Sequence, residues 1–135
     1  MASIDSIEGI GSSYANALNA AGIASVEALL EAGCEKNSRS KLAAKTGISE
    51  KLILKWVNMA DLFRVRGVGR QYAELLECAG VDTVVELAQR NPSSLQAMMT
   101  KTNEEKRVVR QVPSLRIVNS WVTQAKTLPR KVKHS

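Results

Sequence analysis

Residues 64–79 read RVRGVGRQYAELLECA, a short turn with two glycines followed by a helical pattern, with three arginines around the turn. The same turn occurs once before, at residues 7–11, which read IEGIG. There the neighbouring charges are the acids Asp5 and Glu8. Two copies of one turn with opposite charges are the feature on which our predictions of fold and function depend.

The similarity of the two copies extends well beyond the turn. In the first part of each copy, glycine, tyrosine, alanine, valine and leucine recur at a separation of 58 residues. Near the end of each copy the separation is 65 residues. The second copy therefore holds a seven-residue insertion. Such self-similarity indicates a duplicated structural unit. The matched pairs are Gly9 with Gly67, Gly11 with Gly69, Tyr14 with Tyr72, Ala15 with Ala73, Leu18 with Leu76, Gly22 with Gly80, Val26 with Val84, Leu29 with Leu87, Ser49 with Ser114, Trp56 with Trp121 and Ala60 with Ala125.

Apolar residues recur at helical spacing along the whole chain, and no long stretch alternates with the period of a strand. Cap residues and glycines set the expected helix boundaries: Ser25, Ser49, Thr83 and Ser114 precede helices, while Gly22, Gly33, Gly47 and Gly80 end them. Thr102 is expected to open a separate basic helix reaching about Gln111, and Pro129 to begin a frayed basic tail. The sequence therefore predicts an all-α fold. The other expected helices are one that carries Tyr14, Leu18 and Ala21 and stops at Gly22, then 26–30, 39–46, 50–63, 71–79, one from 84, 92–100 and 115–128.

Composition limits the classes of protein to consider. The chain has 135 residues, 44% of them apolar and 4% aromatic, which is enough for a core built from aliphatic side chains. No apolar run approaches the ~20 residues of a membrane span, and we see no secretory signal, so a cytoplasmic protein is expected. Cys34 and Cys78 match no metal or redox spacing, and we expect neither a disulfide nor a cofactor.

Positive charge is concentrated in the second half of the chain. Residues 1–63 hold six Lys and Arg against seven Asp and Glu, whereas residues 64–135 hold thirteen against six. The net charge of +6 therefore comes from the second half. This asymmetry indicates a nucleic-acid partner or an acidic protein partner, although solubility alone is a competing interpretation.

A turn with two glycines between helices suits the binding of phosphate. Glycine permits backbone angles that other residues avoid, and it leaves no Cβ in the way of a close approach. The first N–H groups of the next helix point outward together, at the positive end of the helix dipole. Basic side chains beside them add affinity for nucleic-acid backbone that does not depend on sequence.

Both turns resemble the helix-hairpin-helix superfamily, in which an apolar-Gly-apolar-Gly turn precedes a helix containing alanine. Residues 7–18 and 65–76 fit this pattern. The chain also resembles, nearly end to end, a bacterial family of tandem helix-hairpin-helix-like proteins called DUF4332, a domain of unknown function. The stretches that carry this resemblance are 46–51 (TGISEK), 54–64 (LKWVNMADLFR) and 86–92 (ELAQRNP).

The resemblance implies two tandem SAM-like units of four to five helices packed into one compact body, at residues 1–63 and 64–128, followed by the basic tail 129–135. Similar units occur in the C-terminal domain of the RNA polymerase alpha subunit and the N-terminal domain of recombinases. These relatives serve DNA binding in one setting and protein contacts in another. Many relatives that bind nucleic acid have Pro where this chain has Glu8 and Arg66, so the chain departs from them at both turns.

The second turn is the better candidate for binding. A full helix is expected before it, whereas only six residues precede the first turn, whose acids would repel phosphate. The competing interpretation is that the glycines only allow close helix packing and that the arginines are solvated or pair with Glu74. The residues expected to contact nucleic acid are Arg64, Arg66, Gly67, Val68, Gly69, Arg70, Gln71 and, on the insertion, Lys101, Lys106, Arg107 and Arg110.

We do not expect an enzyme. The only histidine, His134, lies in the expected tail, and neither a P-loop nor a recognisable pair of catalytic acids is present. Trp56 and Trp121 lie on apolar stripes and are expected in the core rather than stacked on bases. The sequence therefore favours a non-enzymatic module that binds DNA or RNA backbone. The alternative is an interaction adaptor whose basic half docks an acidic protein.

Overall fold

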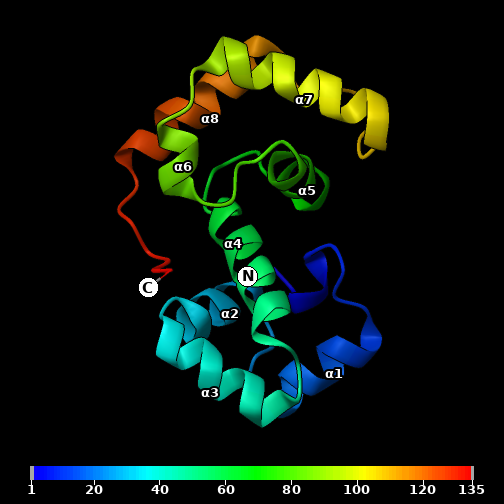
Figure 1. The fold of residues 1–135 in the computed structure, drawn as a ribbon, viewed down its shortest axis with the longest axis vertical. Helices are drawn as coiled ribbons and strands as arrows, with labels where there is room; N and C mark the ends of the chain where they lie inside the picture. The colour runs from blue at the N-terminus through cyan, green and yellow to red at the C-terminus, as the bar shows by residue number, and fades with distance from the viewer. Residues whose placement is uncertain (1, 135) are drawn as a thin grey trace. The chain divides into compact units, whose positions relative to one another are not determined.

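The computed structural model of the chain describes residues 2–134, which form eight α-helices and a short 3₁₀ helix without a strand (Figure 1). The all-α expectation is confirmed. One isolated bridge joins Ser3 to Ser25. The chain divides into two compact units: unit 1 is the described part of Met1–Asp61 with Lys131–Ser135, and unit 2 is Leu62–Arg130. The chain therefore passes between the units twice.

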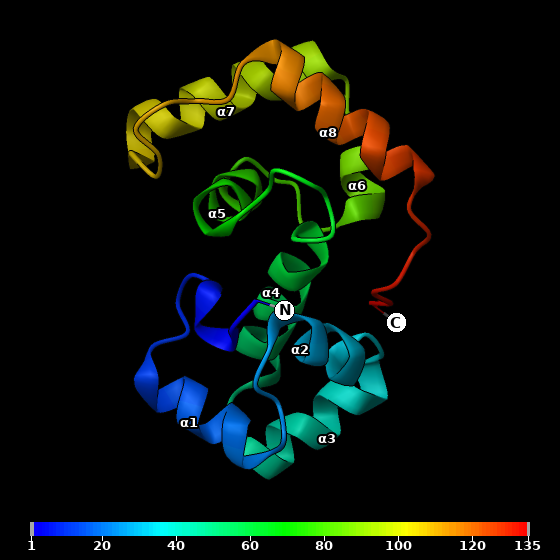
Figure 2. The same cartoon turned by 180° about the vertical axis from the view of Figure 1, so that it is seen from behind.

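Unit 1 contains the first turn and the helices around it. The 3₁₀ helix η1 (Ile4–Ser6) precedes the turn, so the leading element of this copy is short, as expected. It contacts α1 (Ser12–Ala20) and α2 (Val26–Gly33), and α2 packs against α3 (Lys36–Thr46), as Figure 2 shows. The helix α4 (Glu50–Leu62) runs to the boundary of the unit.

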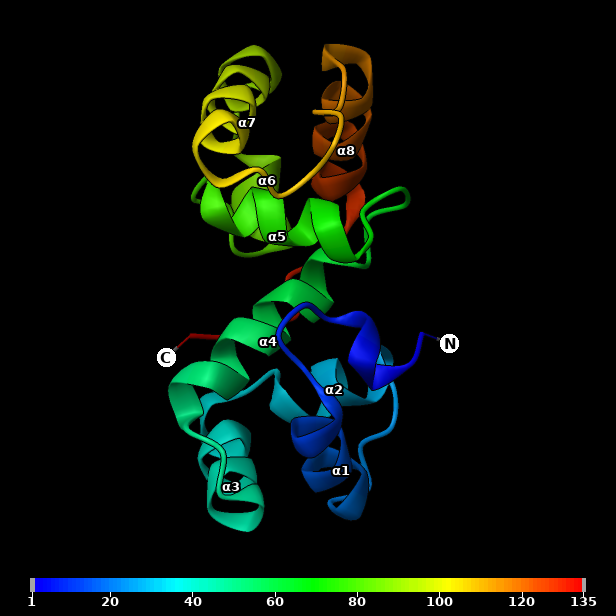
Figure 3. The ribbon, with the colours of Figure 1, turned by 90° about the vertical axis from the view of Figure 1, so that its right-hand side faces the viewer.

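Unit 2 repeats this plan, with a shorter second helix and a longer third helix than unit 1. Its helices are α5 (Arg70–Cys78), α6 (Val84–Ala88), α7 (Pro92–Lys106) and α8 (Leu115–Thr127). Figure 3 shows α7 and α8 side by side, and both α6 and α7 contact α8. Each unit has its own apolar core around one buried tryptophan, Trp56 in unit 1 and Trp121 in unit 2, each 1% exposed. The expectation that both tryptophans pack in cores is confirmed.

Local capping by hydroxyl side chains explains the starts of four helices, α2, α4, α6 and α8. Hydroxyl oxygens accept hydrogen bonds from N–H groups three residues ahead, as the cap residues in the sequence predict. Arg70 and Lys36 begin their helices slightly earlier than expected, and Gly33 is the last residue of α2 rather than the residue after it. The observed caps are Ser25 to Ala28 at 3.0 Å, Ser49 to Leu52 at 3.2 Å, Thr83 to Glu86 at 3.4 Å and Ser114 to Ile117 at 3.3 Å.

The prediction that a separate helix begins at Thr102 is wrong. Helix α7 instead continues without a break from Pro92 to Lys106, because Thr102 is buried on its inner face. The helix ends at Arg107, whose φ is +51°. The side chain of Asn103 then holds the following loop through two hydrogen bonds of 2.9 Å, to the N–H and the carbonyl of Val109. Tertiary burial therefore overrides a plausible capping sequence.

The prediction of a frayed C-terminal tail is also wrong. Residues 131–134 pack on unit 1, where Val132 is only 2% exposed. The guanidinium of Arg39, itself 3% exposed, donates from Nη1 to the carbonyl of Gly33 at 2.8 Å and from Nη2 to that of Lys133 at 2.7 Å. The N–H of Lys133 donates to the carbonyl of Cys34 at 2.8 Å. The tail thus completes the core of unit 1.

Side chains of the tail add polar contacts. Lys131 pairs with Glu31, and Nζ of Lys133 lies 3.7 Å from Oε1 of Glu35. Nε2 of His134 lies 3.1 Å from Oδ1 of Asn58. Burial lowers the pKa of Arg39, although a guanidinium stays protonated at any ordinary pH. A buried cation bound to two backbone carbonyls is therefore the anchor of this segment.

Candidate nucleic-acid interface

The turn of unit 2 is held by its backbone and by Trp121. The N–H of Val68 donates to the carbonyl of Val65 at 3.1 Å, and both valines are buried. Gly67 lies between them with φ at +96°. A Cβ at Gly67 would lie 3.1 Å from Nε1 of Trp121, so both the backbone angle and the close approach require glycine there.

Helix α5 begins directly after this turn with an end that no side chain caps. Its N-cap is Gly69, and the first intrahelical hydrogen bond runs from the N–H of Ala73 to the carbonyl of Gly69 at 2.8 Å. The N–H groups of Arg70, Gln71 and Tyr72, which precede Ala73 in the helix, have no acceptor within the helix. A depression of about 520 Å³ lies beside this helix start and is lined by Gly67, Gly69, Arg70, Gln71 and Tyr72. This arrangement offers an anion hydrogen-bond donors and the positive end of a helix dipole.

The three arginines around the turn differ in their surroundings. Arg66 and Arg70 are exposed, and Arg70 lines the depression. Arg64 is half-buried and donates from Nη2 to the carbonyl of Pro129 at 2.8 Å, so it holds the end of unit 2. Val68 faces the core and offers no side chain to a ligand. The structure therefore leaves Arg66 and Arg70 as the cations best placed beside the turn.

The basic residues of the insertion form a second group. Lys101 and Lys106 lie on α7, Arg107 ends it, Arg110 lies in the following loop, and all four are exposed. The loop reaches the start of α5, where the hydroxyl of Tyr72 donates to the carbonyl of Gln111 at 3.5 Å. The positive charge of Lys106 instead acts to lower the pKa of the Cys78 thiol, at the other end of α5.

The thiol of Cys78 is partly buried beside acidic side chains. Burial is the main cause that raises the pKa of its thiol, and the carboxylates of Glu77 and Glu74 raise it further, while Lys106 acts in the opposite direction. The thiol donates to Oε2 of Glu77 at 3.8 Å. A raised thiol pKa does not favour a nucleophile. Within residues 2–134, no cluster of His, Cys, Asp and Glu could hold a metal ion.

The turn of unit 1 has the same geometry with different side chains. Gly9 has φ at +95°, and a Cβ there would lie 3.4 Å from Nε1 of Trp56. Helix α1 likewise starts at a glycine, Gly11, without a side-chain cap. Its neighbouring charges are Asp5 and Glu8. The two turns thus differ in charge and not in backbone.

The sequence did not predict two residues of the candidate site, Tyr72, which lines the depression, and Gln124. Oε1 of Gln124 accepts from the N–H of Arg66 at 2.9 Å, and Nε2 of Gln124 donates to the Arg66 carbonyl at 3.2 Å. The side chain of Gln124 therefore fixes the backbone of the turn. A signal existed, because the matching position in the first copy is the buried Met59. A polar residue replacing an apolar one indicated a new contact.

Comparison with known proteins agrees with the length of the duplicated region. A family model described as a domain of unknown function, DUF4332, matches residues 8–128. The chain belongs to the DUF4332 family. No curated protein and no solved structure matched this DUF4332 chain. Its described residues also contain no helix with the length and apolar character that crossing a membrane requires.

Proposed function

We propose that this DUF4332 protein is a non-enzymatic, cytoplasmic helix-hairpin-helix module whose unit 2 binds the phosphate backbone of nucleic acid without sequence preference. The observation that carries the proposal is the uncapped start of α5 at a glycine turn, opening into a depression beside Arg70. Unit 2 holds eleven Lys and Arg against six Asp and Glu, a net charge of +5. Its overall charge therefore attracts a polyanion.

Backbone donors account for the lack of sequence preference. N–H groups at a helix start can bind phosphate oxygens, which are the same in every nucleotide. Arg66 and Arg70 would add electrostatic attraction at the rim. With about two phosphates neutralised, the logarithm of the affinity for duplex DNA should fall with the logarithm of salt concentration at a slope near −2, from about −0.9 per phosphate. Binding in the range of ~10⁻⁴–10⁻⁶ M fits a site of this kind.

Fluorescence anisotropy tests the proposal with labelled DNA and RNA, single strands and duplexes, at about 0.15 M salt, the physiological value. The variant Arg66→Glu/Arg70→Glu should lose binding to all of them. Asp5→Ala/Glu8→Ala, at the first turn, should not weaken it. Lys51→Glu/Lys55→Glu, two exposed lysines on α4, controls for the same change in net charge. Absent binding by the folded wild type, or equal loss in both lysine and arginine variants, would contradict the proposal.

A second function is favoured by one further feature of α7. Met98 is 46% exposed and lies one helical turn before Lys101. An apolar side chain beside a cation suits the surface of an acidic protein better than a phosphate backbone. In this alternative the chain is an adaptor, and Met98→Ser/Lys101→Glu should abolish binding of a labelled polyglutamate peptide. If nucleic acid binds through Arg66 and Arg70 and polyglutamate does not bind, the adaptor alternative is wrong.

A further inference from the structure

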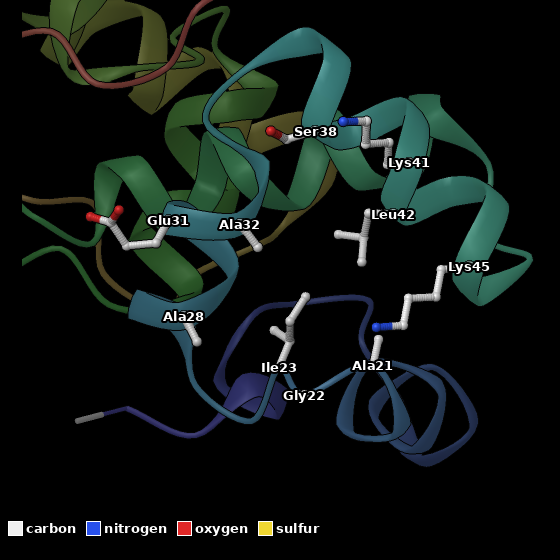
Figure 4. Close-up of a pocket in the computed structure, with 10 residues that line it drawn as sticks. All are labelled: Ala21, Gly22, Ile23, Ala28, Glu31, Ala32, Ser38, Lys41, Leu42 and Lys45. Carbon is white, nitrogen blue, oxygen red and sulfur yellow. The ribbon is translucent and has the colours of Figure 1, made fainter.

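A groove on unit 1 lies away from the glycine turn. It has a volume of about 590 Å³ and is open to solvent along one side. Small residues make up half of its lining, with Ile23 and Leu42 as its larger apolar side chains. Figure 4 shows these two side chains pointing into one hollow with Ala28 and Ala32, while α3 supplies Lys41 and Lys45 at its edge.

The repeat explains why this groove is open. The positions 58 residues later than Ala28 and Ala32 are Glu86 and Arg90 of unit 2. There Nη2 of Arg90 lies 3.4 Å from Oε1 of Glu86 and donates to the carbonyl of Gly80 at 2.9 Å. In unit 2 these positions therefore hold an ion pair whose guanidinium lies against the end of the first helix.

The glycines at the end of the first helix show the same contrast. A Cβ built at Gly80 would lie 3.3 Å from Nη2 of Arg90. A Cβ built at its counterpart Gly22 would meet no atom within 4 Å. The two helix ends have similar φ values of +94° and +86°. The difference therefore comes from the absent side chain and not from the backbone.

The charges at the rim of the groove are unequally compensated. Glu31 is directed away from the hollow in Figure 4 and pairs with Lys131 of the tail. Within residues 2–134, neither the Lys41 nor the Lys45 side chain has an ion-pair or hydrogen-bond partner. These lysines are four residues apart on α3, so their side chains lie about 5–6 Å apart at Cβ on one face. The rim is therefore positively charged over an apolar floor.

We propose that this groove docks a short amphipathic helix of another protein. The partner helix inserts a leucine- or phenylalanine-sized side chain between Ile23 and Leu42 and places carboxylates one helical turn apart against Lys41 and Lys45. Helix-in-groove recognition combines apolar anchors and flanking charges in this way. An open, shallow groove suits an inserted side chain better than a free small molecule, since small-ligand sites enclose most of the ligand surface. Unit 1 thus recruits a protein, independently of any nucleic acid on unit 2.

Selection from a displayed library of random linear peptides on the immobilised full chain provides the probe. We expect the recovered peptides to share one large apolar residue flanked by Asp or Glu. Anisotropy with the synthetic consensus peptide should then show a loss of at least about tenfold in affinity for Ala28→Glu/Ala32→Arg, which installs the ion pair of unit 2. Because unit 2 folds with that pair, thermal unfolding should show that this variant remains folded.

Charge variants separate the floor from the rim. Lys41→Ser/Lys45→Ser should weaken the acidic peptide several-fold, while Lys51→Ser/Lys55→Ser, an exposed pair with the same spacing on α4, should not. Replacing the acids of the peptide by Asn and Gln should remove the effect of the Lys41→Ser/Lys45→Ser change.

Several results would overturn the proposal. They are a selection without binders, peptides without acids, and equal binding to the Ala28→Glu/Ala32→Arg variant. Self-association in sedimentation that is lost in this variant would assign the groove to a second copy of the chain. Octanoate that binds more tightly than the peptide would assign it to a small amphiphile. Arg66→Glu/Arg70→Glu should leave peptide binding unchanged, so failure here is distinct from failure of the nucleic-acid proposal.

Discussion

The turns at residues 7–11 and 65–69 have one backbone and opposite charges. The φ values of Gly9 and Gly67 differ by one degree, and each glycine faces the indole nitrogen of a buried tryptophan. The ring pairs beside them are also alike, with centroids 4.9 Å apart for Tyr14 and Trp56 and 5.3 Å for Tyr72 and Trp121. The contacts that build the turn therefore do not restrict the charges around it.

The two units also differ in how their cores are completed. Unit 1 depends on the tail 131–134, which returns from the far end of the chain to bind Arg39. Unit 2 consists of one continuous segment, and its extra length lies in α7 and in the loop after it. The same repeat was thus extended in two ways, and each way can be tested against the other.

Removing the tail should have the largest effect, and only on unit 1. A chain ending at Arg130 loses the burial of Val132, worth about 1.5–3 kcal/mol, and leaves Arg39 without the Lys133 carbonyl. We expect the free energy of unfolding of unit 1 to fall by about 3–6 kcal/mol, since a hydrogen bond to a charged group adds about 1.5–3 kcal/mol to the loss of burial. Urea unfolding followed by Trp56 fluorescence, in a Trp121→Phe background, measures it.

Two controls define this tail experiment. Lys131→Ala/Lys133→Ala removes only partly exposed ion pairs and should change stability by less than about 1 kcal/mol. The fluorescence of Trp121, in a Trp56→Phe background, should report unchanged unfolding of unit 2. Equal destabilisation of both units by truncation would show that the tail is not specific to unit 1.

The next effect comes from the two turn glycines. Gly67→Ala and Gly9→Ala should each destabilise their own unit by about 1–3 kcal/mol, the cost of a strained backbone at positive φ. Gly67→Ala should cost more, because its Cβ would lie 3.1 Å from the indole nitrogen rather than 3.4 Å. Thermal unfolding of the single-tryptophan backgrounds checks the order. Gly69→Ala, at negative φ with no atom within 4 Å, is the control and should change little.

A smaller effect is expected from moving charge between the turns. Glu8 and Ser12 occupy the positions of Arg66 and Arg70, so Glu8→Arg/Ser12→Arg gives the first turn the charges of the second. If the backbone is the binding element, nucleic-acid affinity should rise several-fold and the salt slope should steepen by about one to two units, at about 0.9 per phosphate. Asn19→Arg/Glu27→Arg adds the same charge elsewhere on unit 1. An equal gain in this control would assign the effect to net charge alone.

The sequence predicted local features well because their causes are local. The caps at Ser25, Ser49, Thr83 and Ser114 each depend on a hydroxyl and an N–H three residues ahead. The turn also has a local signature, two glycines at fixed spacing. The internal repeat, in turn, identified the two tryptophans as equivalent core residues. For the candidate site, the contiguous residues around Gly67 could therefore be predicted together.

What sequence reasoning missed depends on contacts between distant residues. Thr102 looked like a cap, yet it is buried along α7, and only the fold determines that. The hydrogen bond from Arg39 to Lys133 spans 94 positions and leaves no periodic pattern in the short tail. Gln124 lies 58 residues from Arg66, whose backbone it fixes. Such contacts follow from tertiary packing, which the propensity and spacing of neighbouring residues do not encode.

The smallest expected effect concerns Cys78, where the first copy has Ala20. Because burial raises the pKa of the folded thiol, the unfolded chain releases its proton at lower pH than the folded chain does. The stabilisation by the neutral thiol is complete below the unfolded pKa of about 8.5 and is lost as pH rises through the folded value. Wild type should therefore lose stability relative to Cys78→Ala between pH 7 and pH 10, a range that spans about 8.5. Urea midpoints of both proteins at the two pH values measure this, and a constant difference would show that the thiol titrates alike in both states.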